Sequence, residues 1–174
     1  MDIGILQGKP VRTATSFLEL IKVMSISVET VSRRLLVYEG PVAFHAVISG
    51  GETKHLGVNQ NLAFPVVVTN LGGGYHSSHG VFIAPRAGVY IFSTSIMAFH
   101  TGHSTIYTKL MKNGNVLAKA YAHGGSGYQD QGSVTVVTQL APGDEVWVAL
   151  QGPADTSLYG DYFDSFMGCL VVPV

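Results

Sequence analysis

Residues 64–92, FPVVVTNLGGGYHSSHGVFIAPRAGVYIF, decide the fold that the sequence predicts. Three short runs rich in β-branched and aromatic residues lie in this stretch, at 66–69, 81–84 and 89–94. Clusters of Gly, Ser, His and Pro separate the runs. This arrangement is typical of antiparallel strands joined by turns.

The run 89–94 alternates with a period of two. Tyr90, Phe92 and Thr94 fall on one side of a strand, and the residues between them fall on the other. The large rings therefore share one face. Such a face needs a second sheet to cover it.

The same pattern continues along the chain. Strands are expected at 42–47, 105–111, 116–122, 133–140, 145–150 and 163–172, with 96–99 extending the strand at 89–94 and 151–158 left as a loop. The Asn113-Gly114 pair favours a tight type I′ hairpin between two of them. The last strand is apolar on both faces and should lie in the centre of a sheet. Eight to ten short strands with almost no helical period predict an all-β sandwich or barrel.

A family resemblance rests on the spacing of seven residues in the opening stretch: Phe64, Asn70, Tyr75, Phe82, Gly88, Tyr90 and Phe92. This spacing resembles the globular head of the complement component 1q family, with one departure at Thr94, where the family has an aromatic residue. The segments 111–114, 142–147 with Trp147, and 165–168 with Phe166 and Gly168 are similar to the same family in the same order. The resemblance covers residues 41–174.

The resemblance implies a ten-stranded jelly-roll β-sandwich, which fits the strand count. Proteins that look like this family, and like the related tumour-necrosis-factor ligands, assemble as trimers around an apolar axis and are secreted. Stand-alone heads of this kind act in innate immunity as lectin-like pattern-recognition proteins that bind bacterial polysaccharide or sialic acid.

Composition agrees with an assembly. Hydrophobic residues make up 47% of the 174 residues and charged residues only 12%, against a typical charged share of about 25%. We therefore expect apolar surface to be buried between subunits; the alternative is a monomer with a polar but uncharged surface. The lone Cys169 excludes an intrachain disulfide and is expected to be a small buried hydrophobe.

Charge and hydropathy argue against nucleic-acid binding and against a membrane-spanning helix. A net charge of −1 without an Arg/Lys run argues against nucleic acid. No apolar stretch approaches the ~20 residues of a membrane-spanning helix.

Residues 1–40 lie outside the resemblance and are expected to form a leader and an oligomerisation stalk. Apolar residues recur there at heptad spacing: Phe17, Ile21, Met24, Val28, Val31, Leu35 and Tyr38. This pattern favours a short coiled coil over residues 14–38, and an added strand pair is the alternative because Ser, Thr and Val fill the other positions. No signal peptide is visible, so the sequence is either a mature or truncated chain or a cytosolic protein.

No constellation for catalysis is found, and the chain is expected not to be an enzyme. The histidine pairs 76/79 and 100/103 lie in Gly/Ser loops, and no Glu between residues 53 and 144 completes a jelly-roll metal site. The segment 124–128 begins like a nucleophile elbow but ends in Tyr128. The family resemblance implies calcium held through Asp130, although Ala122 replaces a second acidic residue that the family places beside the matching tyrosine.

The remaining expectation is recognition by loops on a rigid sandwich. Aromatic, His and amide side chains that can stack on sugar rings and bond hydroxyl groups are Tyr75, His76, His79, His100, His103, Tyr121, His123, Tyr128 and Gln129. Six of these are the candidate ligand-binding residues: His100, His103, Tyr121, His123, Tyr128 and Gln129. The alternative function is that of a cytokine- or hormone-like trimer that engages a protein receptor at its subunit seams.

Overall fold

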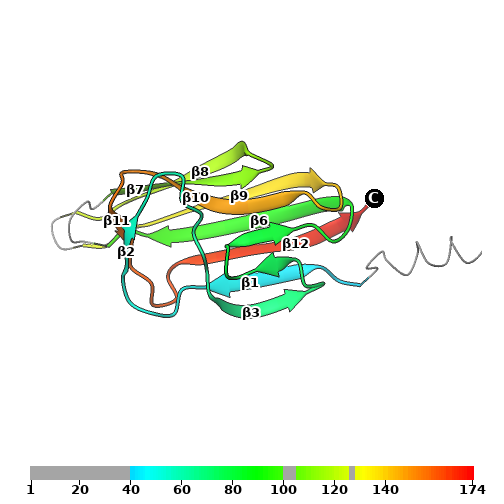
Figure 1. The fold of residues 1–174 in the computed structure, drawn as a ribbon, viewed down its shortest axis with the longest axis horizontal. Coiled ribbons are helices and arrows are strands. Elements are labelled where there is room, and N and C mark those ends of the chain that lie inside the picture. Colours follow the sequence, from blue (N-terminus) through cyan, green and yellow to red (C-terminus); the bar gives the residue numbers. More distant parts are fainter. Residues whose placement is uncertain (1–39, 100–104, 126–127) are drawn as a thin grey trace, which may run out of the picture. The chain divides into compact units, whose positions relative to one another are not determined.

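The head of the chain is an all-β sandwich (Figure 1). The computed structural model describes residues 40–99, 105–125 and 128–174. The predicted stalk at 14–38 and the candidates His100 and His103 lie outside these residues. The strands are β1 (Ala43–Val47), β2 (Thr53–Leu56), β3 (Val66–Leu71), β4 (Tyr75–His76), β5 (Val81–Ile83), β6 (Gly88–Met97), β7 (Thr105–Lys112), β8 (Asn115–His123), β9 (Gln131–Leu140), β10 (Glu145–Gly152), β11 (Thr156–Leu158) and β12 (Ser165–Pro173).

Ten of these strands form two five-stranded sheets. One sheet has the order β3-β1-β12-β6-β9, and the other has the order β4-β5-β10-β7-β8. The named pairs are antiparallel, and β12 occupies the centre of its sheet as its apolar sequence predicts. The predicted ten-stranded jelly roll is therefore confirmed. In the part of the chain that the structure describes, no helix is long and apolar enough to cross a membrane.

Aromatic side chains fill the space between the sheets. Along β6, residues alternate strictly between buried and partly exposed, and Tyr90, Phe92 and Thr94 lie at the centre of the buried set, between Gly88 and Ile96. Phe166 of β12 lies 4.9 Å from Phe44, measured between ring centroids, in an edge-on contact. Edge-on and offset contacts of this kind stabilise aromatic cores.

Hydrogen bonds explain the spacing of the family residues in the opening stretch. The Asn70 side chain donates to the Tyr75 carbonyl at 3.0 Å and accepts from the Tyr75 N–H at 3.1 Å, which closes the turn between them. The buried Tyr75 hydroxyl accepts from the Phe64 N–H and donates to the Phe64 carbonyl, both at 3.2 Å. Burial raises the pKa of Tyr75 to about 12, despite the backbone hydrogen bond, so the hydroxyl stays protonated. Tyr75 is thus a core residue and is wrong as a sugar-stacking candidate.

At Gly168 the backbone passes close to the aromatic rings of this core. A Cβ added there would lie 2.5 Å from two ring carbons of Phe92 and 2.8 Å from a ring carbon of Phe44. Glycine is required because the stacked rings occupy the space that any side chain would need.

Four sequence predictions need correction. The predicted loop at 151–158 contains β11, which pairs with the unpredicted β2 in a two-stranded ribbon. The short strand β4 was also missed. Trp147, which the family resemblance implies is a core residue, is only partly buried, because the alternation along β10 turns it away from the core. Cys169 is partly exposed on the outer surface of its sheet rather than buried.

Asp164 is an unusual buried carboxylate at the start of β12. It accepts hydrogen bonds from the N–H groups of Met97 and Gly160, both at 2.7 Å. Burial raises its pKa from 3.8 to about 6, because loss of water outweighs these two hydrogen bonds.

Stability should therefore depend on pH through Asp164. Between pH ~4 and ~6 the folded state binds more protons than the unfolded state, so the free energy of unfolding falls as pH rises through this window and then levels off. Two pKa units correspond to about 3 kcal/mol. We expect the difference in unfolding free energy between the wild type and Asp164→Asn to change by about this amount from pH 4 to pH 7, measured by urea unfolding. Parallel pH profiles would contradict the assignment.

Candidate functional site

Two tyrosines and a histidine form an exposed aromatic cluster on the β7-β8 hairpin, which we call the tyrosine platform: Tyr107, Tyr121 and His123. Tyr107 pairs with Tyr121 across the hairpin, and Thr105 pairs with His123. The ring centroids lie 4.8 Å apart for Tyr107 and Tyr121, and 6.2 Å apart for Tyr121 and His123, whose rings are nearly parallel. The neighbouring residues Ile106, Thr108, Ala120 and Ala122 point into the core. The platform therefore lies on the outer face of its sheet.

The platform remains open to solvent. Tyr107 is 42% exposed and Tyr121 is 50% exposed. The two tyrosine rings lie in contact and together present apolar area that none of the described residues covers. Their hydroxyl groups add hydrogen-bonding capacity at its edge.

The hairpin carrying the platform is held in place from two sides. Gly132 of β9 passes so close beneath Tyr121 that an added Cβ would lie 2.0 Å from the Tyr121 carbonyl oxygen. His123 Nδ1 lies 2.6 Å from Thr105 Oγ1. The Asp130 carboxylate accepts from the N–H groups of His123 and Gln131, at 3.2 and 3.0 Å. These contacts fix the end of β8 against the start of β9.

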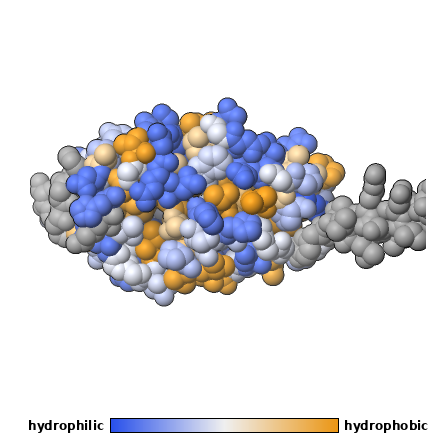
Figure 2. Space-filling model, viewed as in Figure 1, coloured by the Kyte–Doolittle hydropathy of each residue, from blue (hydrophilic) through white to orange (hydrophobic). Residues whose placement is uncertain are grey.

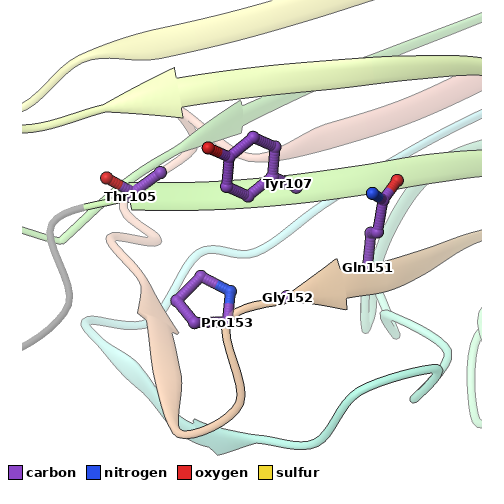
Figure 3. A pocket seen from close by; sticks show the side chains of 5 residues that line it. All are labelled: Thr105, Tyr107, Gln151, Gly152 and Pro153. Carbon is purple, nitrogen blue, oxygen red and sulfur yellow. The ribbon is translucent and has the colours of Figure 1, made fainter.

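A pocket of about 480 Å³ adjoins the platform. Its walls are Thr105 and Tyr107 from β7, and Gln151, Gly152 and Pro153 from the end of β10. Figure 3 shows Tyr107 on one wall with Pro153 opposite it, and Gln151 rising from β10. Gly152 lies opposite Tyr107 in the β7-β10 ladder, where a bulge shifts the register between Leu150 and Gly152. Tyr107 thus belongs to both the pocket and the platform.

Comparison with known proteins agrees with the resemblance. The family model described as the C1q domain matches residues 43–171. The chain belongs to the C1q domain family. Complement C1q tumor necrosis factor-related protein 3 from Mus musculus is 36% identical over 132 residues, which cover 75% of this chain and 51% of that protein; the Homo sapiens protein gives the same figures. The chain thus spans about half the length of these curated relatives.

Solved structures agree on the fold. The globular domain of zebrafish complement 1qA protein has a TM-score of 0.63 at 17% identity, covering 78% of this chain and 100% of that one. The Eiger TNF from S. frugiperda has a TM-score of 0.61 at 14% identity, covering 77% of this chain and 92% of that one. Proteins of the C1q domain family are non-enzymatic signalling or recognition proteins, and this C1q domain is non-enzymatic.

The C1q domain brings together only part of the predicted site. Tyr121 and His123 meet in the platform, whereas Tyr128 is exposed on the loop that follows β8 and Gln129 is partly exposed there. His76 on β4 and His79 in the turn that follows it lie at another part of the same sheet, beside a smaller pocket. Sequence reasoning missed Tyr107, Gln151 and Pro153, although the outward position of Tyr107 in its strand was a usable signal.

Asp130 does not fit the implied calcium site. Calcium requires six to eight oxygen ligands, usually with more than one carboxylate. Among the residues that the structure describes, no group of three or more His, Cys, Asp or Glu could hold a metal ion. Both carboxylate oxygens of Asp130 already accept backbone hydrogen bonds. Its role in this C1q domain is to fasten two strands.

Proposed function

We propose that this C1q domain is a secreted, homotrimeric, lectin-like recognition protein that binds glycans through the tyrosine platform. The observation that carries the proposal is that the outer faces of the two sheets differ in chemistry. One sheet presents an outer face without charge, suited to self-assembly, and the other presents exposed aromatic rings suited to a ligand. Bacterial polysaccharides and sialylated glycans are the candidate ligands.

The surface for self-assembly, which we call the uncharged face, is the outer side of the sheet β3-β1-β12-β6-β9. The cross-strand pairing gives two of its rows: Leu71, Ala43, Cys169, Ile91 and Val137 in one, and Thr69, His45, Met167, Ser93 and Thr135 in the other. Neither row contains Lys, Arg, Asp or Glu. Charged residues are depleted in this way at the cores of stable interfaces.

The edge strand β3 extends this apolar character. Val67, Val68 and Leu71 are all exposed. Figure 2 shows hydrophobic surface along the edge where Figure 1 places β3. An exposed apolar edge strand is a liability for a single subunit, and covering it removes that liability. C1q and tumour-necrosis-factor domains form trimers, and the same state accounts for the uncharged face here.

Trimerisation would raise the avidity with which the platform binds glycans. A single pair of tyrosines binds a sugar weakly, but several sites on one particle raise avidity by 10²–10⁴ without new contacts. Since the platform and the uncharged face belong to different sheets, assembly leaves the platform open. Repetition of a weak site suits a repetitive microbial surface.

Loss of the platform should abolish most of this binding. Tyr121→Ala removes one ring of the tyrosine pair, and we expect at least tenfold weaker binding of the trimer to immobilised bacterial polysaccharide, measured by surface plasmon resonance. Tyr162→Ala is the matched control, because Tyr162 is 63% exposed on the loop before β12 and makes no ring contact with the platform among the described residues. Equal losses in both variants, or no polysaccharide or glycan binding by the wild type, would overturn the proposal.

A receptor ligand is the second candidate, favoured by a different aromatic group. Tyr159 contacts Phe99 at 5.7 Å and Phe163 at 5.5 Å between ring centroids. Tyr162 and Phe163 beside them are 63% and 42% exposed. Exposed aromatic clusters are typical hot spots of protein interfaces. If the chain binds a protein receptor there, Tyr162→Ala should weaken it and Tyr121→Ala should not, the reverse of the glycan result.

A further inference from the structure

A second pocket, which shares no lining residue with the tyrosine platform, combines aromatic rings with carboxylate groups. Its volume is about 410 Å³, and its described walls are Gly51, Glu52, Phe99, Tyr159 and Asp161. A volume of this size falls in the range of small-molecule sites. Aromatic rings and carboxylates on the walls of one pocket are the groups that attract an organic cation.

Backbone hydrogen bonds bring the two aromatic residues of this pocket together. The Phe99 N–H donates to the Ser157 carbonyl at 3.2 Å, and the Tyr159 N–H donates to the Met97 carbonyl at 3.0 Å. These bonds join the end of β6 to the end of β11. The ring centroids of Phe99 and Tyr159 consequently lie 5.7 Å apart, at an interplanar angle of 30°. The two rings together form an aromatic wall.

The loop that follows β11 holds Asp161 at the same pocket. The Asp161 N–H donates to the Gly50 carbonyl at 2.8 Å. A Cβ added at Gly160 would lie 2.0 Å from the same carbonyl oxygen, so the loop lies directly on the segment before β2. Gly51 and Glu52 follow Gly50 in the chain, and this contact therefore brings them near Asp161. The pocket is built by backbone contacts among three segments.

The backbone at Asp161 is in an unfavourable conformation. Asp161 and Tyr162 are consecutive residues with positive φ angles of 50° and 66°. Side chains other than glycine rarely adopt this conformation, and where they do they are concentrated at binding and catalytic sites. The Asp161 carboxylate is exposed and makes no hydrogen bond or ion pair with the described residues. Its oxygens are therefore available to accept hydrogen bonds from a ligand.

A guanidinium group fits these walls better than a quaternary ammonium group does. The faces of aromatic rings attract both cations. Only the guanidinium carries N–H donors, and it pairs with a carboxylate through two parallel hydrogen bonds while its plane stacks on an aromatic ring. Asp161 and Tyr159 offer these two contacts in one pocket. A quaternary ammonium would leave the carboxylate oxygens without donors.

We infer that this pocket binds an arginine side chain of a protein partner, with the guanidinium packed on Tyr159 and Phe99 and hydrogen-bonded to Asp161. The inference rests on the receptor-ligand candidate, because the pocket adjoins the aromatic group that favours that candidate. It is independent of glycan binding by the platform.

The test titrates the full chain with N-acetyl-arginine amide and with N-acetyl-citrulline amide, which has nearly the same shape but no charge. Binding is followed through the backbone amide resonances in heteronuclear NMR spectra. We expect the arginine compound to shift the resonances of Gly51 and Asp161 and to bind about tenfold more tightly than the citrulline compound. Choline, a quaternary ammonium, should bind more weakly than the arginine compound.

Variants of the two walls locate the binding. Asp161→Asn should weaken binding of the arginine compound about tenfold, and it should fold because Asn tolerates a positive φ. Asp155→Asn is the matched control, since Asp155 also has a positive φ, of 61°, and does not line the pocket. Tyr159→Leu should weaken binding as well, whereas Tyr159→Phe, which keeps the ring, should retain it.

The outcomes separate this inference from the functions proposed above. Equal binding of the arginine and citrulline compounds, or tighter binding of choline, overturns it without any variant. Equal effects of Asp161→Asn and Asp155→Asn also overturn it. If Asp161→Asn lowers the melting temperature, the comparison of arginine with citrulline in the wild type decides. The receptor candidate is tested separately by Tyr162→Ala and stands if only the arginine titration fails.

Discussion

Phe166→Ala should lower the free energy of unfolding by about 4 kcal/mol, as expected for removal of a fully buried ring. Phe166 is completely buried, and its ring centroid lies 4.9 Å from Phe44, 5.9 Å from Phe64 and 6.2 Å from Phe92. Phe44, Phe92 and Phe166 belong to the same sheet, Phe64 lies on the segment before β3, and many other buried side chains keep the two sheets at their spacing. The cavity therefore collapses only partly. Urea unfolding followed by fluorescence of the single tryptophan measures the loss at a fixed protein concentration.

Phe163→Ala provides the control for this result. Phe163 lies three residues earlier, and it is 42% exposed with one edge-on contact to Tyr159. We expect a loss below about 1 kcal/mol, since the ring is already partly in water and leaves no enclosed cavity when it is removed. Equal losses in the two variants would mean that the interior is not organised around Phe166.

The core was predictable because its signal is local. The alternation of Tyr90, Phe92 and Thr94 is visible in six residues of sequence, and the structure buries those three. The ribbon of β2 and β11 was not predictable, because Thr53–Leu56 and Thr156–Leu158 are short and mostly polar. Their pairing depends on tertiary contact between segments about a hundred residues apart in the chain.

The candidate site was only half predictable, and a single bulge explains why. A regular hairpin closed by Asn113-Gly114 would place Tyr107 opposite Ala120. The observed register shifts between Leu110 and Met111, so that Tyr107 lies opposite Tyr121. A shift by one residue changes which side chains share a face. Tyr107 and Tyr121 therefore lie opposite each other only because of this register shift, which no pattern in the sequence predicts.

The low share of charged residues and the uncharged face of the sandwich both point to assembly of several chains. The sequence has only 12% charged residues, which predicts buried surface beyond one subunit. Within the single described subunit, the uncharged face collects residues of this kind on one side of one sheet. Cys169, expected to be buried, is partly exposed there beside Ile91 and Ala43. A neighbouring copy of the chain packed on this face would bury Cys169.

Met167→Glu should convert the proposed trimer into single chains of 18.5 kDa. Met167 is 38% exposed in the central strand of the uncharged face, opposite His45 and Ser93. A carboxylate buried there at an interface would lose its water with no Lys or Arg among these neighbours to balance its charge, although His45 and Ser93 can donate hydrogen bonds, at a cost of several kcal/mol for each copy. The fold should survive, since the same side chain in a lone subunit reaches solvent. Light scattering across micromolar concentrations measures the mass.

Val116→Glu is the matched control for charge. Val116 is 47% exposed on β8, in the opposite sheet, and the same carboxylate there should leave the mass of the assembly unchanged. A wild-type protein that is already a single chain at micromolar concentration would contradict the trimer directly. So would a Met167→Glu protein of unchanged mass. If Met167→Glu is a folded single chain, its binding to polysaccharide should fall by 10²-fold or more relative to the wild type, because the tyrosine platform is intact and only repetition is lost.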